Sequence, residues 1–332
     1  MPCRSAGSCA WRAGCPTGEG LGGFNGRAAQ GAGMKLCLAM PSKGHETFLE
    51  AAVRSVLTAW PAAGELEFRI LDAGTDEGTL VRVRRLIEDV DGAELRSKPD
   101  AGQADALRRC FAATDADILG WLNSDDLLLP GAIDHVLERF WANDSIDVLY
   151  GNALFVDAGG RCIGSYPVTG FDGQLLKSFC FLSQPSTFFR ASAYAAVDGI
   201  DAGLDFALDY DLWLRLLAEG ARFQHSRRVL SATRLHSSTK TGTGESQFTR
   251  EVAECQQRAF PGEAVAERAA WQRYRHAYCE GGNRAVAFLV GTVTGGPLPA
   301  LPRRVSWGLR LLLLHARAWL RARGFAGRDL AV

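Results

Sequence analysis

The stretch "DILGWLNSDDLLLPGAI", Asp117 to Ile133, places two adjacent carboxylates between two apolar runs. The first run has the pattern of a buried strand, so the segment Asn123 to Asp126 begins where that strand ends. Aspartates followed by Pro130 can mark the start of a helix. They can equally hold a divalent cation, which prefers oxygen ligands. The stretch alone leaves both explanations open.

The segments around this stretch alternate between strand and helix patterns. Strand patterns cover residues 35–41, 67–72, 93–98 and 117–122, and helical patterns cover 46–60, 78–90 and 103–114. Such alternation is typical of βαβ units in a parallel sheet, whose ligands lie beyond the carboxyl ends of the strands. We therefore predict an α/β fold with a Rossmann-like, mostly parallel sheet flanked by helices.

The chain divides into three predicted regions. Residues 1–33 are rich in Gly, Ala, Ser and Arg without periodicity and are predicted to form a disordered tail. Residues 34–245 form the predicted α/β domain, with a hairpin signal at Gly159 and Gly160 and a helix closed by Gly220. Residues 246–332 are predicted to be a helical extension.

Composition limits the classes of function. The 332 residues carry 37 Lys plus Arg and 37 Asp plus Glu, so no overall field favours a nucleic acid partner. The nine cysteines contain no C-x-x-C pair, so neither a zinc ribbon nor a thioredoxin-type pair is indicated, and their odd, irregular set favours a reducing compartment. No run approaches the roughly 18 apolar residues of a membrane-spanning helix, and the N-terminus lacks the apolar core of a signal peptide. These features predict a cytoplasmic protein.

Polar side chains follow three of the predicted strands. Pro41 and Ser42 follow the first, Asp72 the second, and Asn123 to Asp126 the fourth. On its own, Asp72 would be explained as a turn residue before Gly74. Carboxylates gathered on one edge suit Mg²⁺ or Mn²⁺, which is usually held by one or two carboxylates plus substrate phosphates.

These pieces together resemble family 2 glycosyltransferases, nucleotide-sugar-dependent enzymes with the GT-A fold. The resemblance runs from Lys35 to about Thr241 and rests on several motifs in the family's order. They are "ILDAGTDEGT", "KPDAGQADAL", "GWLNSDDLLLPGA", "QPSTFFR", "LDYDLWLRL" and "RLHSSTKT". The resemblance implies a nucleotide-sugar donor, a saccharide or lipid-linked acceptor, and Mn²⁺ or Mg²⁺ as cofactor.

The resemblance also implies a metal site. The family's D-x-D motif reads here as Asn123-Ser124-Asp125, followed by Asp126. Asn123 is on the donor side, Asp125 corresponds to a metal and donor ligand, and Asp126 supports it. His236 corresponds to a late histidine that binds metal or phosphate, although a lone histidine is more often a surface or core residue.

Further donor and acceptor residues follow from the same resemblance. Pro41 and Asp72 correspond to positions beside the nucleotide base, and Gln103 and Asp105 to a helix that approaches the donor. The family's next acidic position falls on Asp76 or Glu77, because the motif is shifted. Arg108 stands where many relatives have Asn.

Inverting sugar transfer needs a base opposite the leaving diphosphate. Asp209 in "LDYDLW" corresponds to that base by resemblance, and Asp211, Gln184 and Arg190 are assigned to the acceptor side. The alternative for Asp209 and Asp211 is helix capping. For Gln184 and Arg190 it is an ordinary strand and turn.

The leading hypothesis is an inverting, metal-dependent glycosyltransferase acting on a polysaccharide or glycolipid. A sugar-nucleotide nucleotidyltransferase would share the sheet but should carry a Gly-rich phosphate loop, which "MPSKGHET" lacks. A catalytically silent nucleotide-sugar-binding protein is the third alternative. The basic amphipathic segment 303–324 predicts either peripheral contact with the inner face of a membrane or packing against the catalytic domain.

Overall fold

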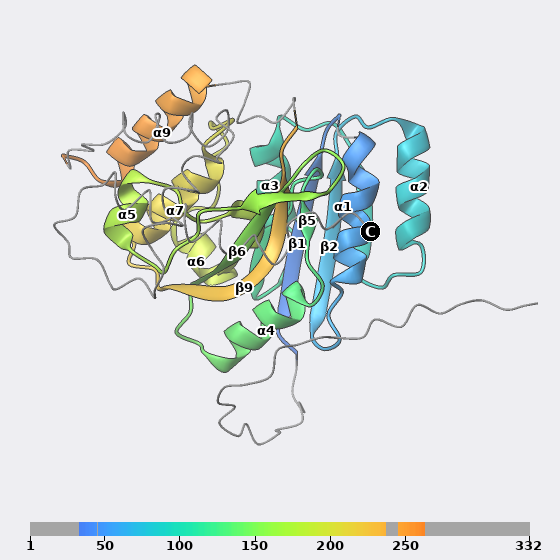
Figure 1. Ribbon diagram of the computed structural model, residues 1–332, viewed down its shortest axis with the longest axis horizontal. Coiled ribbons are helices and arrows are strands. Elements are labelled where there is room, and N and C mark those ends of the chain that lie inside the picture. Colours follow the sequence, from blue (N-terminus) through green and yellow to red (C-terminus); the bar gives the residue numbers. More distant parts are fainter. Residues whose placement is uncertain (1–32, 45, 237–244, 263–332) are drawn as a thin grey trace, which may run out of the picture. The chain divides into compact units, whose positions relative to one another are not determined.

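A computed structural model of the chain describes residues 33–44, 46–236 and 245–262 (Figure 1). The predicted N-terminal tail, apart from Gly33, and the basic segment 303–324 lie outside these residues. Of the predicted extension, residues 246–262 are described. No helix in the described ranges has both the length and the apolar character needed to cross a lipid bilayer.

The first half of the described chain forms the parallel part of the sheet. Strands β1, β2, β3 and β4 pair in the order β3-β2-β1-β4, all parallel, as the sequence predicted. The strands are β1 (Lys35–Ser42), β2 (Glu65–Asp72), β3 (Ala93–Ser97) and β4 (Ile118–Trp121), and the helices between them are α1 (Glu46–Thr58), α2 (Glu77–Ile87) and α3 (Gln103–Ala112).

The second half adds strands of mixed direction. Strand β8 pairs antiparallel with both β4 and β6, β9 runs parallel to β6, and β5 pairs antiparallel with β9. The predicted hairpin is confirmed, since β7 pairs antiparallel with β6. The strands are β5 (Leu127–Leu128), β6 (Val148–Val156), β7 (Cys162–Ser165), β8 (Thr187–Arg190) and β9 (Phe223–Arg234).

The helices of the second half are mostly short. They are α4 (Ala132–Ala142), α5 (Gly173–Ser178), the 3-10 turn η1 (Gln184–Ser186), α6 (Ala191–Ala196), α7 (Leu208–Ala218) and α9 (Glu245–Ala259). Helix α7 is followed by Gly220 at φ 83°, a left-handed position that glycine adopts without strain, so the predicted stop is confirmed.

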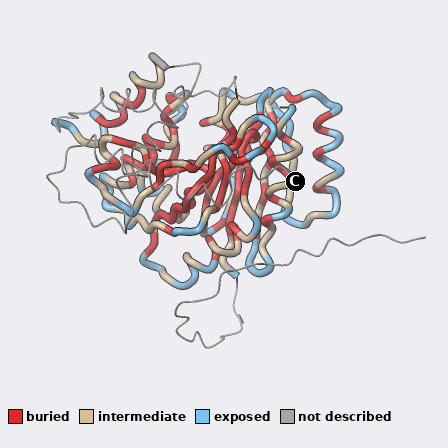
Figure 2. Tube along the Cα trace, in the orientation of Figure 1, coloured by how far each residue is buried: buried red, intermediate tan, exposed pale blue. Residues whose placement is uncertain are grey.

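Two apolar cores lie on opposite faces of the sheet. Alternate residues of β1 point to each: Leu36, Leu38 and Met40 enter one core, and Cys37 and Ala39 the other. The first core also contains side chains of α1, α2 and α4, and the second those of α3, α5, α7 and α9. Figure 1 shows α1 and α2 on one side of the sheet and α5, α7 and α9 on the other, and Figure 2 shows the buried central strands between them. The fold is therefore a sheet covered by helices on both faces.

Helix α2 explains the shifted acidic motif. Asp76 is its N-cap and accepts a hydrogen bond from the Thr79 amide at 3.0 Å. Glu77 lies in the first turn and pairs with Arg84 at 2.5 Å. Both acidic residues therefore have structural contacts at the start of α2.

Gly120 in β4 tests how tightly the sheet is packed. A Cβ atom there would lie 2.6 Å from Cδ1 of Phe188, a residue that is 1% exposed. We expect Gly120→Ala to lower the free energy of unfolding by about 1–3 kcal/mol, measured by urea denaturation. Gly170→Ala is the matched control, since a Cβ there meets no atom within 4 Å. Equal stability of the two variants would contradict the packing.

Candidate active site

The carboxyl ends of β1, β2 and β3 lie level with one another. Ser42 is the register partner of Asp72, and Asp72 is the partner of Ser97. The Asp72 carboxylate accepts hydrogen bonds from Ser97 Oγ at 2.7 Å and from the Thr75 amide at 3.0 Å. Burial would raise the pKa of Asp72, but these hydrogen bonds outweigh it and lower the pKa below its usual value. A fixed anion therefore lies at this edge, with Pro41 beside it on β1.

The acidic loop continues from β4 at the same edge. The Leu122 amide donates to the Ala39 carbonyl at 2.9 Å, so the loop begins beside the last residues of β1. Gln103, the first residue of α3, donates to Asn123 Oδ1 at 2.8 Å. The structure thus brings together Gln103, Asn123 and the end of β1, as the sequence predicted for one edge of the sheet.

The pairing of β5 with β9 brings the acidic pair to His236. Leu127 pairs with Ala232 in antiparallel register, which sets Asp125 and Asp126 opposite the end of β9. His236 Nε2 lies 3.0 Å from Asp125 Oδ2, and the Arg234 amide donates to Asp126 Oδ1 at 2.9 Å. Neither aspartate caps α4, whose N-cap is Gly131. The helix-start explanation of the acidic pair is therefore excluded.

The two aspartates have different surroundings. Asp125 is 9% exposed and faces His236, whereas Asp126 is 3% exposed. Burial and the neighbouring charge of Asp125 raise the pKa of Asp126 well above its usual value, against hydrogen bonds from Arg234 and Asn123. Asp125 is therefore the more exposed carboxylate of the two, and Asp126 is a buried partner of the backbone of β9.

Arg234 is a site residue that the sequence reasoning missed. The residue is 2% exposed, and its guanidinium donates to three carbonyl oxygens: Asp125 at 2.8 Å, Asp157 at 3.2 Å and Ala158 at 3.0 Å. It also lies 4.9 Å from the centroid of the Phe48 ring of α1. A signal was present, because an arginine near the end of a strand pattern stands two residues before the predicted ligand His236.

Two side chains at this edge have the chemistry of ligands for a divalent cation. Asp125 and His236 offer a carboxylate oxygen and an imidazole nitrogen on adjacent side chains. In the described ranges, no group of three or more His, Cys, Asp or Glu side chains could hold a metal ion. A cation here would therefore take its remaining ligands from water and substrate phosphates, as Mg²⁺ commonly does.

Asp209 lies in the first turn of α7. Four residues later on the same face, Trp213 stacks on Trp121, the last residue of β4, with centroids 5.9 Å apart. The Asp209 residue keeps some exposed surface, yet burial of its carboxyl raises its pKa to about 6, against a hydrogen bond from the Tyr210 amide at 2.7 Å. A carboxyl with this pKa is suited to act as a base near neutral pH.

Gln184 adjoins this region. Its side-chain amide donates to the Trp121 carbonyl at 2.6 Å, while its Oε1 is buried without a hydrogen-bond partner. Because Trp121 ends β4, Gln184 lies near the edge that carries the acidic loop. A buried acceptor of this kind is suited to a ligand hydroxyl or a water molecule.

Three other predicted residues have structural contacts elsewhere. Arg190 pairs with Ile118 at the amino end of β4 and donates to the Ile146 carbonyl at 2.8 Å, on the edge opposite the acidic loop. Asp211 is fully buried in ion pairs with Arg215 and Arg258. Asp105 accepts from the Ala101 amide at 3.0 Å and pairs with Arg109.

The Arg108 side chain also makes structural contacts. It donates to the carbonyls of Asp198 at 3.1 Å and Ile200 at 2.6 Å. These contacts fix the segment that follows α6, so the guanidinium at this position is used in packing.

Comparisons with known proteins agree with this geometry. Residues 37–188 match the family model described as "Glycosyl transferase family 2". The chain is 25% identical over 198 residues to the chondroitin synthase of Pasteurella multocida, which is 59% of this chain and 20% of that protein. It is 27% identical over 208 residues to the succinoglycan biosynthesis protein ExoU of Rhizobium meliloti, 57% of this chain and 58% of ExoU. The chain thus spans about a fifth of the first relative.

Solved structures show the same fold. The S. aureus TarS fragment 1–349 in complex with UDP-GlcNAc superposes with a TM-score of 0.57 at 14% identity, covering 77% of this chain and 76% of that one. The mannosyltransferase PcManGT from Pyrobaculum calidifontis, in complex with GDP-Man and Mn²⁺, superposes with a TM-score of 0.51 at 13% identity. The match covers 85% of this chain and 86% of that one.

The fold is therefore that of the GT-A glycosyltransferases. Within it, residues 37–188 match the model of glycosyltransferase family 2, the family that the motifs around Asp72 and Asp125 resemble.

Asp72 can be tested by its effect on stability. We expect Asp72→Asn to lower the free energy of unfolding by about 1–3 kcal/mol at pH 7. The new NH₂ group would face the hydroxyl of Ser97 or the amide of Thr75, both of which donate to Asp72, so one hydrogen bond is lost. Because the pKa of Asp72 is lowered in the folded protein, its ionised carboxylate stabilises the fold at every pH above the ordinary pKa of 3.8. This stabilisation is lost as pH falls through the lowered pKa of the folded state.

Urea denaturation of both proteins between pH 7 and pH 3 checks this expectation. The stability difference should shrink on acidification. A difference that stays constant over the whole pH range would contradict the assigned role of the charge.

Proposed function

We propose that this chain is an inverting, metal-dependent glycosyltransferase that moves one sugar from a nucleotide-diphosphate donor to a polysaccharide or glycolipid acceptor. The observation that carries the proposal is the 3.0 Å contact of Asp125 with His236 at the carboxyl edge of the parallel strands. The raised pKa of Asp209, on a helix packed against the end of β4, supports it further.

The donor would lie along the carboxyl edge of β1, β2 and β4. The nucleotide base would lie near Pro41 and the fixed Asp72 carboxylate. The diphosphate would lie near Asp125 and the Gln103–Asn123 hydrogen bond. This direction agrees with the order of the polar groups along the edge.

Asp125 and His236 would hold Mn²⁺ or Mg²⁺, with Asp126 behind them as a supporting group. When bound, the cation neutralises negative charge on the departing diphosphate. Asp126 fixes the loop through the Arg234 amide, so it would act by positioning Asp125. The PcManGT structure, which contains GDP-Man and Mn²⁺, supports a cation beside the donor.

Asp209 would be the catalytic base. Its carboxylate takes the proton from the acceptor hydroxyl as that oxygen attacks the anomeric carbon. The new glycosidic bond forms on one face while the bond from that carbon to the diphosphate oxygen breaks on the other. The configuration at the anomeric carbon is therefore inverted, and the nucleoside diphosphate leaves with the bonding electrons.

The acceptor is proposed to be a saccharide chain. The names of the relatives support this, since they include a chondroitin synthase and a succinoglycan biosynthesis protein. Gln184, with its buried Oε1 facing no partner, would contact the acceptor or the transferred sugar. Action at the cytoplasmic face of a membrane stays a prediction, because the basic segment 303–324 lies outside the described residues.

Asp209→Asn is the direct test of the base. We expect transfer from a nucleotide sugar to fall by at least a hundredfold, since an amide takes up no proton, while donor affinity changes less than twofold. Release of UDP or GDP, with a screen of donors and acceptors, measures transfer. Asp144→Asn, which replaces an exposed carboxylate at the opposite edge, should leave activity unchanged.

The pH dependence gives a second test of Asp209. A base must be ionised, so kcat/KM should rise with pH through about 6 and then level off. The raised pKa also means that ionisation of Asp209 destabilises the fold. This loss of stability begins as pH rises above the ordinary pKa of 3.8 and is complete above about 6.

Asp209→Asn should therefore melt at a higher temperature than the natural protein at pH 7.5 but not at pH 3.5. If the variant is inactive but its melting temperature at pH 7.5 is unchanged, that result would contradict the burial of the Asp209 carboxyl.

Asp125→Ala tests the cation site. We expect Mn²⁺ and UDP or GDP together to raise the melting temperature of the natural protein but not of this variant, because the variant lacks the accessible oxygen ligand. Asp115→Ala, an exposed carboxylate at the amino edge, is the control. Full Mn²⁺-dependent stabilisation of Asp125→Ala would refute the assignment of this ligand.

A further inference from the structure

Helix α9 supplies a carboxylate to the start of α7. Glu251 is 7% exposed and accepts hydrogen bonds from the amides of Phe206 at 2.8 Å, Ala207 at 2.9 Å and Asp205 at 3.3 Å. Ala207 is the N-cap of α7. Amides at a helix start lack partners within the helix, and a carboxylate there is also favoured by the helix dipole. From a separate helix, Glu251 therefore holds the N-cap amide of α7 and the two amides that precede it.

Two more side chains of α9 hold the next residues of α7. Gln256 donates to the Tyr210 hydroxyl at 3.2 Å, and Arg258 pairs with the buried Asp211. Together with Glu251, these contacts reach residues 207, 210 and 211, on both sides of Asp209 in the chain. Val252 and Cys255 fill the apolar contact between the two helices.

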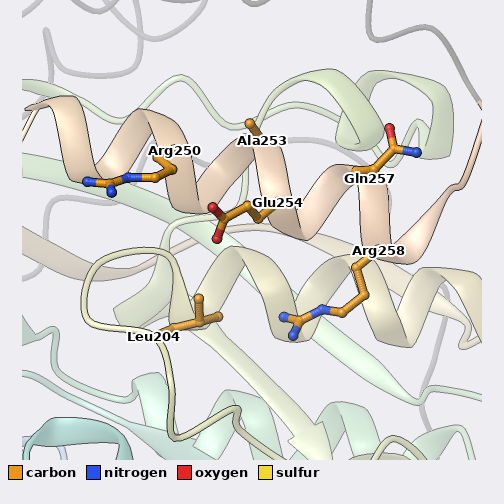
Figure 3. Close-up of a pocket in the computed structure, with 6 residues that line it drawn as sticks. All are labelled: Leu204, Arg250, Ala253, Glu254, Gln257 and Arg258. Atoms are coloured by element: carbon orange, nitrogen blue, oxygen red, sulfur yellow. The ribbon is translucent and has the colours of Figure 1, made fainter.

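Exposed side chains of α9 lie next to this contact. Arg250, Glu254 and Gln257 are exposed there and line a pocket of about 670 Å³ with Leu204 (Figure 3). Glu254 lies one turn from Glu251 on the same helix. This exposed glutamate is therefore a matched control for the buried one.

The direction of the Asp209 carboxylate depends on the backbone of this first turn. Its hydrogen bond is to the Tyr210 amide, so the side chain follows the local backbone. The amides that Glu251 holds lie two to four residues earlier in the chain. Loosening them would free the turn that carries the carboxylate, and small misplacements of a catalytic group cost large factors in rate.

We propose that Glu251 is a positioning residue for the proposed base Asp209, and that α9 holds the first turn of α7 in the catalytic geometry. This inference rests on the proposed function. Glu251 acts through the backbone amides of residues 205–207. Loss of Glu251 should therefore affect the chemical step much more than donor binding.

The test compares Glu251→Ala, Glu251→Gln and Glu254→Ala in the full chain. We expect kcat for sugar transfer to fall more than tenfold in Glu251→Ala, with the KM for the donor within twofold. The effect of Glu251→Gln should be smaller, because its amide oxygen keeps part of the cap. Glu254→Ala should match the natural protein.

Hydrogen exchange measures the positioning directly. Amides of residues 205–211 should exchange at least tenfold faster in Glu251→Ala, while those of α4 stay unchanged. If Glu251→Ala fails to fold, Glu251→Gln carries both measurements. Natural exchange rates in that segment, a kcat within twofold of the natural value, or a fall in kcat matched by an equal rise in donor KM would each overturn the inference.

The proposed function fails separately, if the natural protein transfers no sugar from any donor. In that case the exchange rates of residues 205–211 still decide whether Glu251 holds the start of α7.

Discussion

The buried guanidinium of Arg234 is the contact on which the candidate site depends. It donates to the carbonyls of Asp125, Asp157 and Ala158, which belong to the acidic loop and to the turn between β6 and β7. Burying a charge is costly unless its hydrogen bonds are satisfied. Here they are satisfied by backbone oxygens, so the charge ties two loops together without neutralising Asp125. The Asp125 carboxylate lies 3.0 Å from His236 Nε2 instead.

The asparagine at the head of the acidic motif is consistent with this arrangement. Asn123 accepts from Gln103 and also bonds to the Asp126 carboxyl. An aspartate at that position would bring a third carboxylate beside an already buried pair and would have no proton to donate to Asp126. The amide links α3 to the acidic loop without adding a third carboxylate to it. The departure from D-x-D therefore has a structural reason in the contacts of this chain.

The parallel half of the fold could be predicted from the sequence because its signals are local. In residues 35–122, apolar side chains recur with the strand period of 2 or the helix period of 3.6, and each period shows within a short segment. These patterns placed Asp72 and Asn123 at strand ends on one edge of the sheet. Other contacts join residues far apart in the chain: Arg234 meets Asp125 across 109 positions, and Glu251 reaches Ala207 across 44. No local pattern reveals such pairings, so both Arg234 and Glu251 were missed. Arg190 was assigned by its neighbours in the sequence, but β8 runs antiparallel and carries it to the opposite edge.

The two halves of the candidate site are held by different kinds of contact. The donor side is built from strand ends in fixed register, so the places of Ser42, Asp72 and Asn123 follow from the sheet itself. The base side lies beyond residues 37–188, which match the family model, and is held by side chains of α9 acting on α7. Strand register is resistant to single substitutions, whereas a helix held by a few side chains is not. In the proposed mechanism, the geometry of acceptor attack would therefore be set by contacts that can change without disturbing the proposed donor edge.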